Sequence, residues 1–201
     1  MRRPRGVAHI VVIVVLLLAV AIGRYPWPRV AVQAGSPTPG FTGTSTQPTA
    51  SPSGIRVGSL IEATVSRNVD GDTLHVLTSS GATEKVRFIG VNTPESTIEH
   101  EHYGKEASDY TKKRLPVGTR VWLETDVGLR DRYGRLLAYV WLSPPTSGSA
   151  ADVRAKMFNA ELLIQGYAQL MTIPPDVKYA DLFVPLQAAA RDASRGLLGL
   201  P

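Results

Sequence analysis

The chain has 201 residues, of which 43% are apolar, so it is long enough for one ordinary globular domain with additional segments. Its formal net charge of +5 comes from the N-terminal part, because five of the 22 Lys and Arg residues and none of the 17 Asp and Glu residues precede Ile55. The remainder is neutral, so net charge is no evidence for nucleic-acid binding, and the absence of cysteine excludes disulfides, thiolate metal sites and a lipid-modified cysteine.

The N-terminal segment, residues 1–24, has the pattern of an export signal. Three arginines in the first five residues precede the apolar run Ile10–Ile22, which predicts that the rest of the chain crosses the membrane. Ala19–Ala21 fits a small-residue cleavage site, whereas Arg24 and the nearby Trp27 suit an interfacial anchor. Both a signal peptide and a signal anchor remain open, so the protein is expected to be secreted or anchored to the outer face of the cytoplasmic membrane.

Residues 25–54 are rich in Ser, Thr, Pro and Gly, and lack the apolar side chains that would repay the entropy of ordering. They are predicted to form a disordered linker. Residues 55–201 then remain as one folded domain. No protein partner is predicted for it, and a monomer is expected.

Within this domain, alternation of apolar and polar residues predicts strands, and helical spacing of apolar residues predicts helices. Five strands interleaved with three helices indicate an α+β, mainly β domain: a five-stranded OB-fold barrel with three packed helices. The expected strands are Leu60–Val65, Thr73–Leu77, Lys85–Val91, 120–126 and 135–142, and the expected helices are 105–115, a short one from Phe158 to Gly166, and 181–199.

Candidate site residues occur in three stretches. In "DGDT", Asp70 is expected to satisfy the amides of a turn, while Asp72 projects from the following strand. In "VRFIGVNTPE", a strand carrying Arg87 runs into an amide, a proline-fixed turn and a carboxylate. In "RDRYGRLLAYVWL", Arg135 begins another strand.

These stretches together resemble the staphylococcal nuclease (thermonuclease) family over roughly Leu60 to Gly199. DGDT, R-x-x-G-V-x-T-P-E, Y-G-K-E-A-S-x-Y-T-K-K, D-x-Y-G-R-x-L-A-Y and N-A-E-L-L-x-Q-G-Y-A follow one another in the family's order. Five fragments in register make a chance match very improbable.

The resemblance implies an OB-fold enzyme that hydrolyses phosphodiester bonds of DNA and RNA with Ca²⁺ and leaves 3′-phosphates. By position, the resemblance makes Arg87 and Arg135 the catalytic arginines and Glu95 the residue that activates water. It likewise makes Asp72, Asn92 and the backbone carbonyl of Thr93 the metal ligands, and Tyr133 a substrate-binding residue. Chemistry agrees, because two guanidiniums can meet the oxygens of a phosphate with fixed geometry, and a hard cation takes oxygen ligands.

Two departures from the family pattern stand out. Asn92 replaces a second metal-binding aspartate, which keeps an oxygen ligand but removes a charge, so weaker metal binding is expected. Thr172 and Pro174 stand where the family has tyrosines near the nucleotide pocket, which predicts weaker stacking on the base.

Two other classes of function remain open from the sequence. One is an OB-fold module that binds nucleic acid with weak or no catalysis. The other is a membrane-tethered interaction module that uses the linker as a stalk, with membrane contact through an uncleaved N-terminal segment.

Overall fold

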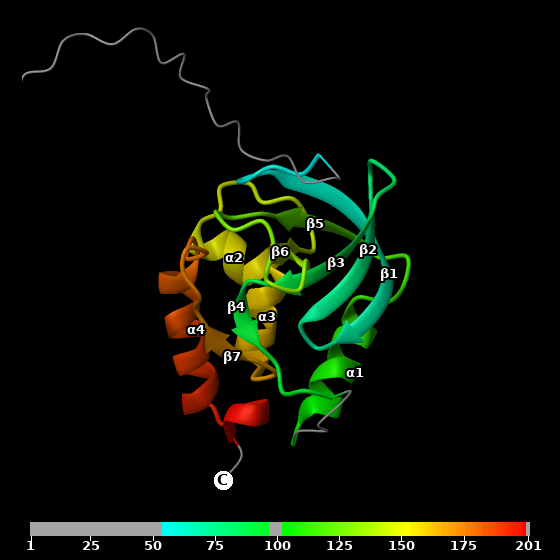
Figure 1. Ribbon diagram of the computed structural model, residues 1–201. Helices are drawn as coiled ribbons and strands as arrows, with labels where there is room; N and C mark the ends of the chain where they lie inside the picture. Colours follow the sequence, from blue (N-terminus) through cyan, green and yellow to red (C-terminus); the bar gives the residue numbers. More distant parts are fainter. Residues whose placement is uncertain (1–53, 97–101, 200–201) are drawn as a thin grey trace, which may run out of the picture. The chain divides into compact units, whose positions relative to one another are not determined.

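The computed structural model describes residues 54–96 and 102–199 (Figure 1). The predicted export segment 1–24 and nearly all of the predicted linker 25–54 lie outside the described residues. Among the helices of the described part, none is long and apolar enough to cross a membrane.

The centre of the domain is the predicted five-stranded closed barrel. Its strands follow the order β1-β2-β3-β6-β5, and all neighbours are antiparallel except β3 and β6. This confirms the OB-type architecture. The barrel strands are β1 (Leu60–Asp70), β2 (Thr73–Thr78), β3 (Thr83–Phe88), β5 (Arg120–Glu124) and β6 (Leu136–Trp141).

Two strand boundaries differ from the sequence prediction by three residues or more, and the others differ by at most two. β1 continues to Asp70 instead of ending at Val65, and it passes through two irregularities in its pairing with β2. The third strand, expected to continue to Val91, stops at Phe88, and β4 (Gly90–Asn92) leaves the barrel to pair with β7 (Gln169–Met171). Gly90 permits this break because it has φ +78° and a Cβ there would lie 2.6 Å from the Phe183 ring.

Four α-helices accompany the barrel, one more than predicted. The additional helix, α2, begins after Ser149, whose hydroxyl accepts a hydrogen bond from the amide of Asp152. The short helix predicted to end at Gly166 does so, with this glycine at φ +73°. The helices are α1 (Gly104–Arg114), α2 (Ala150–Lys156), α3 (Phe158–Gln165) and α4 (Ala180–Asp192), and the 3₁₀ helix η1 (Gly196–Gly199) follows.

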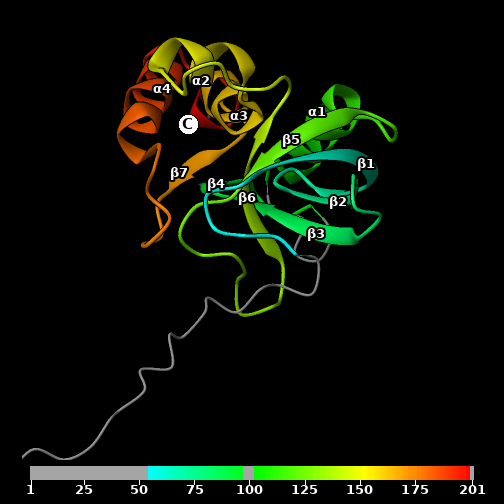
Figure 2. The ribbon, with the colours of Figure 1, turned by 90° about the horizontal axis from the view of Figure 1, so that it is seen from above.

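The core fills the barrel and extends beneath α3 and α4. Leu74, Val76 and Leu136 are fully buried, and Phe158 of α3 meets Phe88 edge to face at 5.9 Å. Each such side chain contributes about 1.5–3 kcal/mol by leaving water. In Figure 2, α2, α3 and α4 gather on one side of the barrel, away from β2 and β3.

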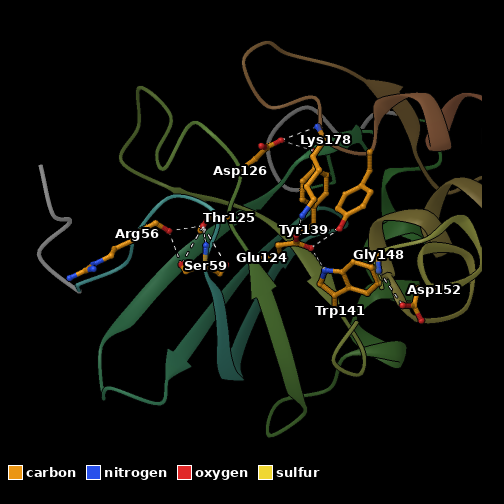
Figure 3. A network of polar contacts seen from close by, with 11 residues as sticks. Arg56, Ser59, Glu124, Thr125, Asp126, Tyr139, Trp141, Gly148, Asp152 and Lys178 are labelled. Carbon is orange, nitrogen blue, oxygen red and sulfur yellow. Dashed lines mark hydrogen bonds and ion pairs between the residues drawn. The ribbon is translucent and has the colours of Figure 1, made fainter. Parts of the chain in front are cut away.

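A buried carboxylate ties the barrel to the segment before α4 (Figure 3). Glu124 of β5 accepts a hydrogen bond from the Trp141 indole at 2.8 Å and one from the Tyr179 hydroxyl at 3.0 Å, and it pairs with Lys178. Because every one of these groups has a partner, the cluster fixes the start of α4 against the barrel.

Candidate active site

One pocket of about 830 Å³ lies where the β1–β2 turn, β3, β4 and the loop before β6 meet. The seven residues singled out from the sequence come from four segments of the chain, yet all of them line this pocket. They are Asp72, Arg87, Asn92, Thr93, Glu95, Tyr133 and Arg135.

A hydrogen bond from α1 fixes the turn between β1 and β2. The Thr111 hydroxyl donates to the carbonyl of Gly71 at 2.7 Å, and both residues are buried. Gly71 also lies against Thr93, because a Cβ at position 71 would be 2.8 Å from that side chain. A glycine is therefore required if the two loops are to approach so closely.

Asp72 faces the pocket with both carboxylate oxygens engaged. Oδ1 accepts from the Thr73 hydroxyl at 3.0 Å, and Oδ2 accepts from the amide of Thr93 at 2.9 Å. Oδ2 also lies 3.1 Å from Nη2 of Arg87. The carboxylate thus joins the β1–β2 turn to the loop after β4.

Arg87 is held by a set of oxygen acceptors. Its Nη1 donates to the carbonyls of Phe88 and Val91, both at 2.8 Å, and its Nη2 donates to Oδ1 of Asn92 at 2.9 Å. Burial lowers the pKa of this guanidinium, the charge of Asp72 raises it, and the charge of Arg135 lowers it again. The guanidinium is therefore positioned before any substrate arrives, and its field overlaps that of the second arginine.

Two oxygens of the kind that a hard cation takes as ligands lie close together here, although in this structure both bind Nη2 of Arg87. Asp72 Oδ2 and Asn92 Oδ1 both lie about 3 Å from this one positively charged atom, so a carboxylate and an amide oxygen converge on it. The hydroxyl of Thr93 is buried beside them and has no hydrogen-bond partner. Such a set of oxygen donors suits Ca²⁺. Within the residues that the structure describes, no group of three or more His, Cys, Asp or Glu side chains is arranged to hold a metal.

Glu95 follows directly on this loop and lies beside Asp70. Burial raises the pKa of the Asp70 carboxyl, hydrogen bonds from Ser96 and Gly71 lower it, and the neighbouring Glu95 carboxyl raises it. Ser96 donates to Asp70 at 2.6 Å. The backbone carbonyl of Glu95 touches the start of α1, where a Cβ on Gly104 would lie 2.4 Å away.

Arg135 is oriented by a residue that the sequence reasoning missed. Oδ2 of Asp131 accepts from Nε of Arg135 at 2.6 Å, and Oδ1 accepts from the amides of Tyr133 and Arg135 at 2.9 and 3.0 Å. Burial raises the pKa of Asp131, but the hydrogen bonds from Arg135 and the backbone bring it below its ordinary value. The signal lay in "DRYGR", because an aspartate that opens a turn commonly accepts from amides two residues on.

Tyr133 stands at the mouth of the pocket with 68% of its surface exposed. The guanidiniums of Arg132 and Arg135 lie 4.8 and 5.4 Å from its ring centre. Its ring is thus anchored by cations and presents a face to solvent.

A second missed feature is an apolar wall at the end of β7 and directly after it, formed by Met171, Ile173, Pro174 and Pro175. Met171 and Ile173 are 41% and 57% exposed. Asp176 secures the wall by accepting from the amide of Gly128 at 2.6 Å. Pro174 therefore lines the pocket without an aromatic ring, while Thr172 is not among the lining residues.

Comparisons with known proteins point to one family. Residues 85–198 match the family described as staphylococcal nuclease homologue. The chain is 41% identical over 130 residues to a thermonuclease of Staphylococcus intermedius, which covers 63% of this chain and 70% of that protein. It is 37% identical over 136 residues to a thermonuclease of Staphylococcus hyicus, covering 66% and 73%. It is also 36% identical over 129 residues to the SPbeta prophage-derived endonuclease YokF of Bacillus subtilis (strain 168), covering 62% and 39%.

Proposed function

The chain belongs to the staphylococcal nuclease family and is a nuclease, and from this premise we propose that it is an exported, Ca²⁺-dependent enzyme that hydrolyses DNA and RNA. The observation that carries the proposal is the convergence of Arg87, Arg135, Glu95 and an oxygen cluster on one pocket. The substrate phosphate would bind between the two guanidiniums.

Arg87 and Arg135 stabilise the transition state in this proposal. As water attacks phosphorus in line, negative charge grows on the equatorial oxygens, and a preorganised guanidinium meets those oxygens with two parallel hydrogen bonds. Both arginines are already oriented, Arg87 by backbone carbonyls and Arg135 by Asp131. Because both Nη groups of Arg87 already have acceptors, Arg87 would exchange its contacts with Asp72 and Asn92 for phosphate oxygens when the substrate binds.

Asp72, Asn92 and the carbonyl of Thr93 would hold the metal ion. Ca²⁺ bound there would supply a positive charge that neutralises the phosphate and orients a water molecule. Asn92 contributes an oxygen without a charge, so the affinity for Ca²⁺ should be lower than with two carboxylates.

Glu95 would accept the proton of the attacking water. Its carboxyl lines the same pocket as the two arginines and lies beside the Asp70 carboxyl, so it is within reach of a water molecule bound at the phosphate site. Water then adds to phosphorus, the bond to the 5′ oxygen breaks, this oxygen takes a proton from solvent and leaves as a 5′-hydroxyl, and a 3′-phosphate remains.

The base next to the scissile bond would rest between Tyr133 and the apolar wall. Apolar contact with Ile173 and Pro174 offers less directional contact than stacking on a second aromatic ring. We therefore expect little discrimination between bases.

Export is proposed from the N-terminal sequence. Residues 1–24 carry the positive flank and apolar run of a signal, so the domain would act outside the cytoplasm, either released or tethered through residues 25–54.

The test is degradation of single-stranded DNA by the purified chain while Ca²⁺ is titrated from zero into the millimolar range. Cleavage that requires Ca²⁺, stops with EDTA and is lost in Arg135→Ala supports the proposal. A folded chain that binds the DNA but never cleaves it, with any divalent ion, would instead identify a binding module.

A further inference from the structure

Three basic side chains form a row across the outer face of the barrel, next to the pocket. Strand pairing places Arg67 of β1 opposite His75 of β2, and His75 opposite Lys85 of β3. Neighbouring strands lie about 4.8 Å apart, so the row spans roughly 10 Å. We call these three residues the basic row.

Two members of the basic row, Arg67 and His75, are in contact. Nη2 of Arg67 lies 3.1 Å from Nε2 of His75. Because a guanidinium can only donate, Nε2 must accept, and the imidazole is then neutral with its proton on Nδ1. Burial lowers the pKa of His75, and the charges of Arg67 and Lys85 lower it further.

No carboxylate balances the basic row among the described residues. Neither Arg67 nor Lys85 forms an ion pair there, whereas Arg114, Arg120, Arg130 and Lys156 each pair with an acid. The next row on the same face consists of Thr64, Leu77 and Thr83, which carry no charge. Glu84, beside Lys85 in the chain, is buried and binds Arg130. Arg67 and Lys85 therefore lie on either side of the neutral His75 with no acid to neutralise their charges, and an anion bound along the row would do so.

The basic row leads into the pocket. Lys85 and Arg87 are two residues apart on β3, so both side chains project from the same face of the sheet, and both line the pocket. An anionic polymer with one phosphate between the two arginines can therefore continue along β3, β2 and β1.

We propose that the basic row binds the phosphates of a single polynucleotide strand beyond the bond that is cut. This inference rests on the proposed function, since it extends the same substrate away from the same pocket. Such contacts are made with the sugar-phosphate backbone of the polynucleotide and carry no sequence information, so they strengthen binding without selecting bases. They favour long substrates over dinucleotides.

The test measures binding separately from cleavage. A fluorescent single-stranded oligonucleotide of about 10 nucleotides, within the range that one OB fold covers, is titrated with the Arg135→Ala chain in EDTA at several salt concentrations. Each phosphate contact on a single strand contributes about 0.7 to the slope of log affinity against log salt. Arg67→Gln and Lys85→Gln, made in this background, should each lower the slope by about that amount, and Arg67→Lys should retain it.

The matched control is Arg154→Gln. Arg154 is exposed on α2, on the other side of the barrel from β2 and β3 (Figure 2), and should leave the slope unchanged. An equal loss in this control, or an unchanged slope in both row variants, would overturn the inference.

A second arm uses the chain with Arg135 intact. Lys85→Gln should raise KM for the long oligonucleotide and leave a dinucleotide substrate unaffected, while an equal effect on both would contradict a site beyond the scissile bond. If the intact chain cleaves nothing but the salt slope falls as stated, the basic row stands and the proposed nuclease reaction fails. If cleavage occurs and the slope does not change, only the basic row is refuted.

Discussion

Nη2 of Arg87 lies 3.1 Å from Oδ2 of Asp72, so the residue proposed to stabilise the transition state pairs with the one proposed to bind the metal. The pair is largely buried, with side-chain exposures of 13% and 8%. A charge removed from either partner leaves the other uncompensated in the pocket. The activity of variants at Asp72 or Arg87 must therefore be interpreted together with a measurement of their stability.

Replacing Arg87 by lysine tests the geometry of the guanidinium. Lysine keeps the positive charge but cannot bind the two backbone carbonyls and Asn92 together. We expect turnover of single-stranded DNA to fall by about 10²–10³-fold, as for the loss of one preorganised donor. Steady-state kinetics measure the turnover, and a thermal unfolding curve shows that the variant is folded. An unchanged rate would mean that a positive charge alone is sufficient at this position.

Replacing Asn92 by aspartate tests the metal ligands. The change adds a charge to an oxygen that already lies beside Asp72 and Arg87, so Ca²⁺ affinity should rise. Titration calorimetry measures it directly. Asn68→Asp adds the same charge at a residue that binds the carbonyl of Leu115 instead, and should not change the affinity. If Asn92→Asp does not tighten binding, Asn92 is not a ligand.

Replacing Asp131 by asparagine tests how Arg135 is positioned. Asparagine can still accept from the backbone amides, but the ion pair with Nε of Arg135 is lost. We expect kcat to fall by about 10–100-fold, the range that small misplacements cost, with little change in KM. Asp109→Asn, on the exposed face of α1, is the control and should leave kcat unchanged. A rise in KM alone would mean that Asp131 serves substrate binding.

The free energy of unfolding should depend on pH through the protonation of His75. Its pKa is lowered in the folded protein from 6.5, so the unfolded chain binds a proton more readily, and stability falls as the pH drops below 6.5. Denaturant unfolding at about pH 8 and about pH 5 measures this loss. His75→Gln should remove part of the difference between the two values. A difference of the same size in the variant would show that other groups cause it.

The barrel could be predicted because its strands carry local signals. Leu74, Val76 and Val86 alternate with polar residues, and each of them is buried. The break at Gly90 was not predicted, although the apolar positions shift there from Val86 and Phe88 to Ile89 and Val91. The positive φ of Gly90 and its contact with Phe183, far along the chain, explain why the strand ends at Phe88.

The candidate site likewise combines residues that the sequence identifies with residues whose role depends on the folded structure. Its principal residues lie in short motifs that can be recognised in the sequence, whereas Asp131 acts only once the turn before Arg135 has closed. The basic row depends on the register of three strands, which the spacing of its residues does not reveal. Helix α2 was missed because its seven residues follow a segment rich in Pro, Ser and Gly that is typical of a loop.

The most direct test of the account is a double-mutant cycle on the two arginines. We would measure kcat for Ca²⁺-dependent hydrolysis of single-stranded DNA by the unchanged chain, Arg87→Ala, Arg135→Ala and the double variant. If both guanidiniums act on one phosphate, each single change lowers kcat by about 10²–10³-fold, and the double variant loses much less than the product of the two. A single variant that retains the full rate would contradict the account.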